Sequence, residues 1–177
     1  LKRKKENPFN LHYLGKENEK SFDEIFKKGY YVFPCIGNNK IRKSLINNFN
    51  DFKLNQFNVF DKNSIISDNA KIGVSNYFGP NSVVNSFSKI GNGVIINSAS
   101  VIEHHCKIGD FTHIAPNSTL CGNVKIGNLS FIGANTVIKE NITVGNDILI
   151  GAGSTVVKSL NYSGVYFGSP LKMKEDK

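Results

Sequence analysis

Three of the four histidines in this chain, His104, His105 and His113, fall within one stretch of ten residues, while His12 stands apart. Imidazole titrates near neutral pH, so it can remove a proton from an attacking amine or hydroxyl group. A histidine cluster of this kind could serve general-base catalysis, or its side chains could simply be exposed to solvent on a turn. Whether these side chains can reach a substrate depends on the elements that carry them.

The cysteines offer a weaker chemical signal. Cys35, Cys106 and Cys121 are odd in number and form no CxxC pair, which predicts free thiols in a reducing cytoplasm. Cys106 occupies an inward position of the repeat described next, so we expect it in the core. Cys121 has no obvious partner base, so neither residue is expected to be a nucleophile.

A strict period of six residues runs through the middle of the chain. Sixteen consecutive positions at this spacing are large and apolar, and the residue two places before each is usually small or β-branched. An α-helix would spread these positions around its circumference, whereas a short strand followed by a turn keeps them on one side. The sixteen positions are Ile66, Ile72, Phe78, Val84, Ile90, Ile96, Ile102, Ile108, Ile114, Leu120, Ile126, Ile132, Ile138, Val144, Ile150 and Val156.

This pattern is the signature of a hexapeptide solenoid, a parallel β-helix. Three hexapeptides close one triangular coil, so the repeat predicts a little over five coils, about 25 Å tall at roughly 4.8 Å per strand. The residue after the large one is often glycine, and asparagine is frequent. We expect both to adopt the left-handed conformations of tight corners.

The net charge of +8 is concentrated at the two ends of the chain. Residues 61–156 carry as many acidic as basic side chains, so no continuous basic face for nucleic acid is expected. No apolar run is long enough to cross a membrane, and the basic start Leu1–Lys5 does not lead into a secretory signal. The basic ends are expected to be solvated or to contact small phosphate-bearing ligands.

A small α/β unit is predicted in front of the solenoid. Ser21 to Glu24 is typical of a capping box that opens a short helix ending at Gly29. Tyr30–Ile36 is typical of a buried strand, and Asn38–Phe49 of a second helix.

Three segments resemble the left-handed β-helix acyltransferases. Ile95–His113 (IINSASVIEHHCKIGDFTH) is similar to the active-site stretch of one subfamily, the nucleotide-aminosugar N-acetyltransferases and the related sialic acid O-acetyltransferases. Ile36–Arg42 (IGNNKIR) and Gly168–Lys172 (GSPLK) resemble two further signatures of that subfamily. The resemblance implies a mainly β fold, a left-handed parallel β-helix with a small N-terminal α/β domain.

The same resemblance divides the chain into three parts. Residues 1–58 are expected to form a partial α/β domain that binds the nucleotide sugar, and residues 59–160 the β-helix acyltransferase domain. Residues 161–177 would form a tail whose GSPLK segment lies near coenzyme A. The strand and His-containing, glycine-rich loop that usually open the family's N-terminal domain have no match in this sequence.

The resemblance also assigns roles to residues. His104 would be the general base, with His105, Glu103 and Asn97 as further catalytic residues. Acetyl-CoA would be held by His113, Gly122, Ala134, Ala152 and Lys172, and the nucleotide sugar by Gly37, Asn38, Asn39 and Arg42. Gly122 lies one coil beyond His104, so its N–H is a candidate donor to the developing oxyanion. The resemblance implies no metal, and it implies a homotrimer in which His113 acts from the neighbouring subunit.

One position departs from the family pattern. The family commonly has Asp or Glu directly after the catalytic histidine, where a carboxylate orients the imidazole and raises its basicity. This chain has His105 there and keeps Glu103 on the other side.

The expected reaction is acetyl transfer from acetyl-CoA to the amine of a 4-amino-4,6-dideoxy sugar on UDP or GDP. A sugar-hydroxyl or serine O-acetyltransferase is the nearest alternative, because the same base would serve it. A non-catalytic scaffold also remains open. A carbonic anhydrase of this fold would need three zinc-binding histidines at a different spacing, and an ice-binding prism would need aligned threonine faces.

Overall fold

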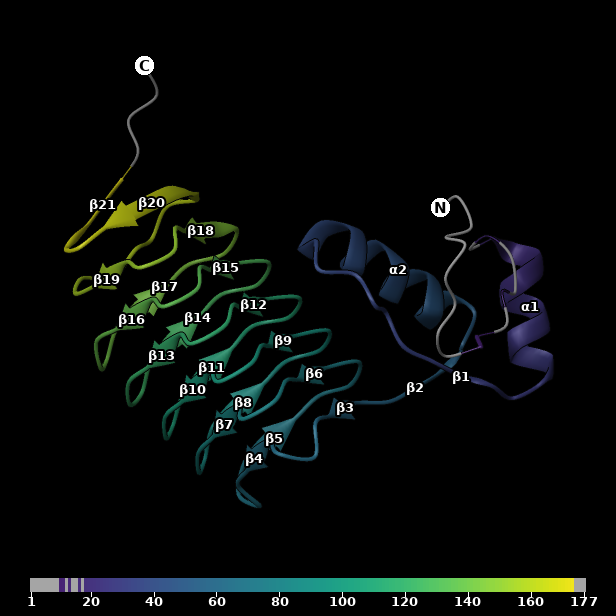
Figure 1. The fold of residues 1–177 in the computed structure, drawn as a ribbon. Coiled ribbons are helices and arrows are strands. Elements are labelled where there is room, and N and C mark those ends of the chain that lie inside the picture. Colours follow the sequence, from purple (N-terminus) through teal and green to yellow (C-terminus); the bar gives the residue numbers. More distant parts are fainter. Residues whose placement is uncertain (1–9, 12, 14–15, 17, 174–177) are drawn as a thin grey trace.

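A three-sided prism of stacked parallel strands makes up most of the molecule. The computed structural model describes residues 10–11, 13, 16 and 18–173, and therefore not Leu1–Lys5 or His12. In the described part, two helices and a two-stranded sheet precede the prism, and a C-terminal hairpin lies at its far end (Figure 1). The predicted fold class is confirmed, a mainly β chain built on a left-handed parallel β-helix with a small N-terminal α/β region.

Each face of the prism is one sheet. The first face consists of β3 (Val59–Phe60), β6 (Tyr77–Phe78), β9 (Ile95–Ile96), β12 (His113–Ile114), β15 (Phe131–Ile132) and β18 (Ile148–Ile150), extended by the hairpin of β20 (Gly164–Gly168) and β21 (Leu171–Met173). The second face consists of β4 (Ile65–Ile66), β7 (Val83–Val84), β10 (Val101–Ile102), β13 (Thr119–Leu120), β16 (Val137–Ile138) and β19 (Thr155–Val156). The third face consists of β5 (Lys71–Ile72), β8 (Lys89–Ile90), β11 (Lys107–Ile108), β14 (Lys125–Ile126) and β17 (Thr143–Val144).

The register of these sheets follows directly from the sequence period. Val101 pairs with Thr119, and Ile102 pairs with Leu120, so each strand lies beside the strand one coil further along the chain. The large apolar residue of each hexapeptide points inward as predicted, and Ile96, Ile102 and Ile114 are fully buried. Because the strands are so short, stability depends on the stacking of coils rather than on any single strand.

Small polar residues share the interior with these large ones. The Ser100 hydroxyl donates to the carbonyl of Ala115 at 2.9 Å, and the Thr112 hydroxyl donates to that of Gly127 at 2.7 Å. A buried hydroxyl would be costly without such a partner, so each one also serves to tie its coil to the next.

The prediction for the corners is partly wrong. Where a corner has a left-handed residue, that residue stands three places after the large apolar one, as at Asn81, Asn117 and Asn135. The glycine directly after the large residue is needed for another reason, the close approach of the next coil. A Cβ on Gly127 would lie 2.6 Å from the carbonyl carbon of Gly145.

In the N-terminal unit, the first helix and the strand begin and end at other residues than predicted. Helix α1 (Glu19–Lys27) begins before the predicted capping box, because Asn18 is the N-cap and Ser21 closes the box from inside the helix. Strand β1 (Tyr31–Val32) is much shorter than predicted and is not buried, since Tyr31 is 69% exposed. It pairs in parallel with β2 (Asn55–Gln56).

Helix α2 (Asn39–Asp51) matches its prediction closely, with Asn38 as N-cap. It lies beside the prism (Figure 1) and packs through Ile46 into a second core with Phe22, Phe49 and Leu54. Phe111, from a corner of the prism, packs against this core. Neither described helix is long and apolar enough to cross a membrane.

Candidate active site

His104 and His105 lie at the corner that follows β10, between the second and third faces. Both are exposed. The Nδ1 atoms of the two rings are 3.1 Å apart, and the rings meet edge to face. His105 takes the left-handed position of its corner, with φ of 61°. The corner thus presents a paired imidazole on the outside of the prism.

The ring of His104 lies directly against the corner of the next coil. A Cβ on Gly122 would be 2.7 Å from Cε1 of His104 and 2.9 Å from its Nε2. Glycine is therefore the residue that leaves room for this ring. The N–H of Asn123 donates to the His104 carbonyl at 2.9 Å, which fixes the two corners to each other. The free ring nitrogen of His104 consequently lies beside the Gly122 backbone, although the oxyanion role of that backbone stays a prediction.

Glu103 forms hydrogen bonds with the preceding coil through its carboxylate and its carbonyl. Its carboxylate accepts from the Asn85 side-chain amide at 3.1 Å, one coil earlier, and its carbonyl accepts from the Ser88 hydroxyl. His105 is therefore the group that contacts Nδ1 of His104, the atom that the family's carboxylate would be expected to orient.

The cysteines near this corner are not activated. Cys106 is fully buried, as predicted, and its thiol donates to the Cys121 carbonyl at 3.2 Å. Burial raises the pKa of Cys106 to about 11, and burial also raises the pKa of Cys121. Since the thiolate is the nucleophilic form, neither residue is poised for covalent catalysis.

His113 lies away from this corner, on the first face of the prism, where the N-terminal unit packs against it. The side-chain amide of Asn97 lies 3.3 Å from its Nε2, so Asn97 accompanies His113 rather than His104. Burial, together with the positive charge of Arg42, lowers the pKa of His113 to about 4. His113 is accordingly neutral at physiological pH.

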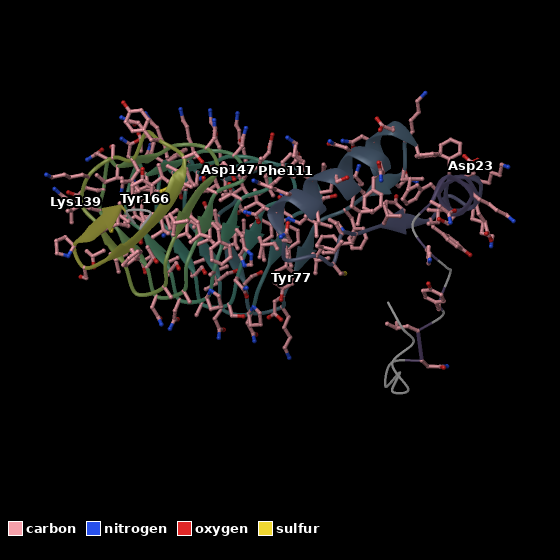
Figure 2. All side chains as sticks on the ribbon, turned by 90° about the horizontal axis from the view of Figure 1, so that it is seen from above. Asp23, Tyr77, Phe111, Lys139, Asp147 and Tyr166 are labelled. Carbon is pink, nitrogen blue, oxygen red and sulfur yellow. The ribbon has the colours of Figure 1, made fainter. Side chains whose placement is uncertain are left out.

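A cavity of about 380 Å³ opens beside His113. One wall is the segment from Phe33 to Gly37, and the other is the first face, where Tyr77 and Ile95 line it together with Asn97 and His113. Tyr77 lies where the N-terminal unit meets the prism (Figure 2). The cavity is mainly apolar with a few polar groups, which is the usual character of a small-molecule site.

Arg42 lines the same cavity, but its guanidinium serves the fold. It is 1% exposed and donates to the carbonyls of Ile36, Gly37, Gly93 and Phe111 and to the Asn39 side chain. These bonds join α2 to the prism, and Phe111 lies on the side of the prism that α2 covers (Figure 2). Its N–H groups are thus already engaged, which leaves none of them for a substrate phosphate.

Asn38 and Asn39 are also engaged within the protein. The Asn38 side chain caps α2, and the Asn39 amide donates to the carbonyls of Leu129 and Ser130, each at 3.0 Å. Four residues were expected to bind the sugar nucleotide. Two of them, Gly37 and Arg42, line the cavity, and the Arg42 side chain is already bonded within the protein.

The remaining expected cofactor residues lie on the Asn97 side of the prism. Ala134 and Ala152 follow β15 and β18, at the corner between the first and second faces where Asn97 follows β9. Lys172 belongs to β21, but its side chain lies outside the described part of the structure.

The expected site residues therefore form two groups in one chain, separated by the second face. One group is His104, His105 and Gly122, and the other is Asn97, His113, Ala134 and Ala152.

Tyr77 and Ile95 line the cavity but were not predicted from the sequence. They occupy the outward position of their hexapeptides on the first face, Ile95 one coil and Tyr77 two coils before His113. The outward residues repeat every 18 positions, and comparing them face by face would have revealed this surface.

Comparisons with known proteins agree with this architecture. The family model "Bacterial transferase hexapeptide (six repeats)" matches residues 87–122 and 123–158. No curated protein matches the chain. Solved structures do match it over most of its length.

PerB from Caulobacter crescentus, solved with CoA and GDP-perosamine, is 28% identical, with a TM-score of 0.86 over 89% of this chain and 77% of that one. The acetyltransferase domain of PglB from Neisseria gonorrhoeae, solved with acetyl coenzyme A, is 27% identical, with a TM-score of 0.83 over 86% and 75%. WeeI from Acinetobacter baumannii is 27% identical, with a TM-score of 0.78 over 82% and 71%.

The chain has the hexapeptide coils and the fold of the left-handed β-helix acyltransferases. It is an acetyltransferase, similar in fold and sequence to PerB and to the PglB acetyltransferase domain.

Proposed function

We propose that this protein transfers the acetyl group of acetyl-CoA to the amine of a nucleotide-linked sugar, in particular a 4-amino-4,6-dideoxy sugar on UDP or GDP. The observation that carries the proposal is the contact of the His104 ring with Gly122, one coil further on, which brings an imidazole and a glycine backbone together on the outside of the prism. Acyl transfer to an amine uses both groups, a base for the amine proton and a donor for the oxyanion.

The residues of this chain would take different roles in the reaction. Nε2 of His104 would take the proton from the acceptor amine as the amine attacks the thioester carbonyl. The Gly122 N–H would donate to the oxygen of that carbonyl as its negative charge develops. The attack is direct, because neither Cys106 nor Cys121 is available to form an acyl-enzyme. Collapse of the tetrahedral intermediate would break the carbon–sulfur bond, and the departing coenzyme A thiolate would take the proton from His104 and leave as the free thiol.

Acetyl-CoA would lie along the corner that carries Ala134 and Ala152, where small side chains permit close approach, and Lys172 would meet a phosphate. The residues around Gly37 and the cavity above Tyr77 would hold the nucleotide sugar. This arrangement assigns residues 1–58 to the acceptor and residues 59–160 to acetyl transfer. The free thiols of the three cysteines support a cytoplasmic setting.

We also propose a homotrimer, because one chain keeps His104 and His113 on either side of its second face. The outward residues of the second face are apolar or β-branched, namely Ile65, Val83, Val101, Thr119, Val137 and Thr155. The third face instead carries exposed Lys71, Lys89, Lys107 and Lys125. Burying four stacked ammonium groups would be costly, so the second face is the better subunit contact.

Complementation tests the shared site. His104→Ala and His113→Ala would each inactivate a trimer when present in all chains. Trimers assembled by mixing and refolding the two variants would contain some intact sites and should recover measurable acetyl transfer. A mixture as inactive as its parts, or a monomeric mass by light scattering, would contradict the shared site.

The chemical assignment is tested with matched acceptors. Acetyl transfer should be measured with a UDP- or GDP-linked 4-amino sugar and with its 4-hydroxy analogue, using mass spectrometry to locate the acetyl group. The proposal expects acetylation of the amine. Acetylation of the hydroxy analogue at a comparable kcat/KM would favour the O-acetyltransferase alternative.

A further inference from the structure

The contact between His104 and His105 constrains where their protons lie. The two Nδ1 atoms are 3.1 Å apart, which is a hydrogen-bond distance. A neutral imidazole carries hydrogen on one nitrogen and a lone pair on the other. One Nδ1 must therefore donate and the other must accept, which leaves two arrangements.

Only one arrangement provides a base at Nε2 of His104. If Nδ1 of His104 donates, its Nε2 keeps a lone pair beside Gly122 and can take a proton. If Nδ1 of His105 donates, Nε2 of His104 already carries hydrogen and cannot act as a base.

We propose that His105 is a positioning residue whose Nδ1 accepts the hydrogen of His104 Nδ1 and thereby keeps the Nε2 of His104 free. The inference rests on the proposed function, in which His104 is the base. It gives a neutral imidazole the task that a carboxylate would otherwise perform. The bond also persists after catalysis begins, because the His104 imidazolium still donates through Nδ1 when Nε2 has gained a proton.

The structure holds His105 in place for this task. Its left-handed backbone sets the direction of the side chain, and its N–H donates to the Ser86 carbonyl at 3.0 Å. Its ring packs against Phe87, with centroids 5.1 Å apart. Glu103 does not compete for His104 in this arrangement, because its carboxylate accepts from Asn85.

Two substitutions separate positioning from corner structure. His105→Gly removes the ring and suits a left-handed backbone. His105→Asn also tolerates this backbone, and its amide oxygen supplies an acceptor near the position of Nδ1. If His105 served only the fold of the corner, the two variants would behave alike.

The direct readout is the ¹⁵N NMR signature of the His104 ring in the substrate-free protein, at alkaline pH where imidazole is neutral. The proposal expects hydrogen on Nδ1 and a bare Nε2 in the parent and in His105→Asn. It expects a mixture of tautomers in His105→Gly. Hydrogen on Nε2 in the parent, or an unchanged tautomer in His105→Gly, would overturn the proposal.

Kinetics provide the second readout. His105→Gly should lower kcat by about 10- to 100-fold, the usual cost of losing an orienting partner, with little change in the KM of either substrate. His105→Asn should recover at least a third of this loss on a logarithmic scale. Equal losses in both variants would overturn the positioning role. A parent that acetylates no aminosugar but shows the expected tautomer would refute the proposed function and leave the His105 assignment standing.

Discussion

Replacing Gly122 by alanine should lower kcat strongly while leaving the fold intact. The added Cβ would lie 2.7 Å from Cε1 and 2.9 Å from Nε2 of His104. Ordinary carbon contacts begin near 3.5 Å, so the imidazole must retreat by roughly 1 Å. The ring is exposed and has space to move, and the backbone of residue 122 has no positive φ that would strain alanine.

The stability of this variant should therefore change by less than about 1 kcal/mol, since the smaller entropy of the unfolded chain offsets part of any strain. A displacement of about 1 Å at a catalytic group can cost roughly 10²-fold in rate. We expect kcat to fall by about that factor with KM unchanged. Urea denaturation and steady-state acetyl transfer measure the two quantities separately.

Gly127→Ala is the matched control. Its Cβ would meet backbone atoms of Gly145 and Asn146 at 2.6 and 2.7 Å, and these atoms cannot move aside independently. This variant should lose about 1–3 kcal/mol of stability but keep its kcat per folded molecule.

A double mutant isolates the mechanism. In a His104→Ala background, where about 10²- to 10⁴-fold of the rate is already lost, Gly122→Ala should have no further effect. A kcat within about threefold of the parent for Gly122→Ala alone would refute the role of the ring position. A further loss in the double mutant would show that the methyl group acts on something other than His104.

Three further predictions concern the fold and its pH dependence. Ile102→Ala should destabilise the protein by about 2–5 kcal/mol in urea denaturation, because Ile102 is fully buried, and a loss below 1 kcal/mol would contradict the core assignment. Arg42→Lys should lower the melting temperature clearly without removing charge, because an ammonium cannot replace the forked bonds to Gly93, Ile36 and Phe111, and an unchanged melting temperature would contradict the clamp. The pKa of His113 is about 4 in the folded chain against an ordinary 6.5, so the unfolded chain binds the proton first and stability is lost as pH falls from about 6.5 toward 4. In His113→Gln, up to about 3 kcal/mol of this acid-induced loss of unfolding free energy should disappear. Profiles of unfolding free energy against pH that run parallel for the parent and the variant would refute this prediction.

The sequence predicted the prism because its period leaves little choice of fold. The large apolar residues at the six-residue spacing all point into the prism, and from Phe78 onward they are buried, so the pattern determines the inward direction and the one-coil register. The contact between His104 and Gly122 follows from this register, since the two residues are one coil apart. What the period does not determine is why a given corner residue must be glycine, because that depends on how closely two coils approach.

The N-terminal unit was harder to predict because its interactions are tertiary. Nothing local to Arg42 indicates that its guanidinium will be buried against Gly93 and Phe111, more than 50 residues further along the chain. The contact of Asn97 with His113 could not be predicted locally either, because it depends on where the prism places each of these two residues. The helix start at Asn18 was missed because Ser21 to Glu24 offers an equally good local capping pattern.

Acetyl transfer from acetyl-CoA to a panel of UDP-, GDP- and dTDP-linked aminosugars tests the central claim most directly. Release of the free thiol of coenzyme A should be followed for each acceptor, with the acetylated product identified by mass. We predict that a UDP- or GDP-linked 4-amino-4,6-dideoxy sugar is acetylated on its amine with the highest kcat/KM, and that His104→Ala abolishes most of this activity. Thiol release with none of the aminosugars, or activity within about threefold of the parent in His104→Ala, would contradict the account.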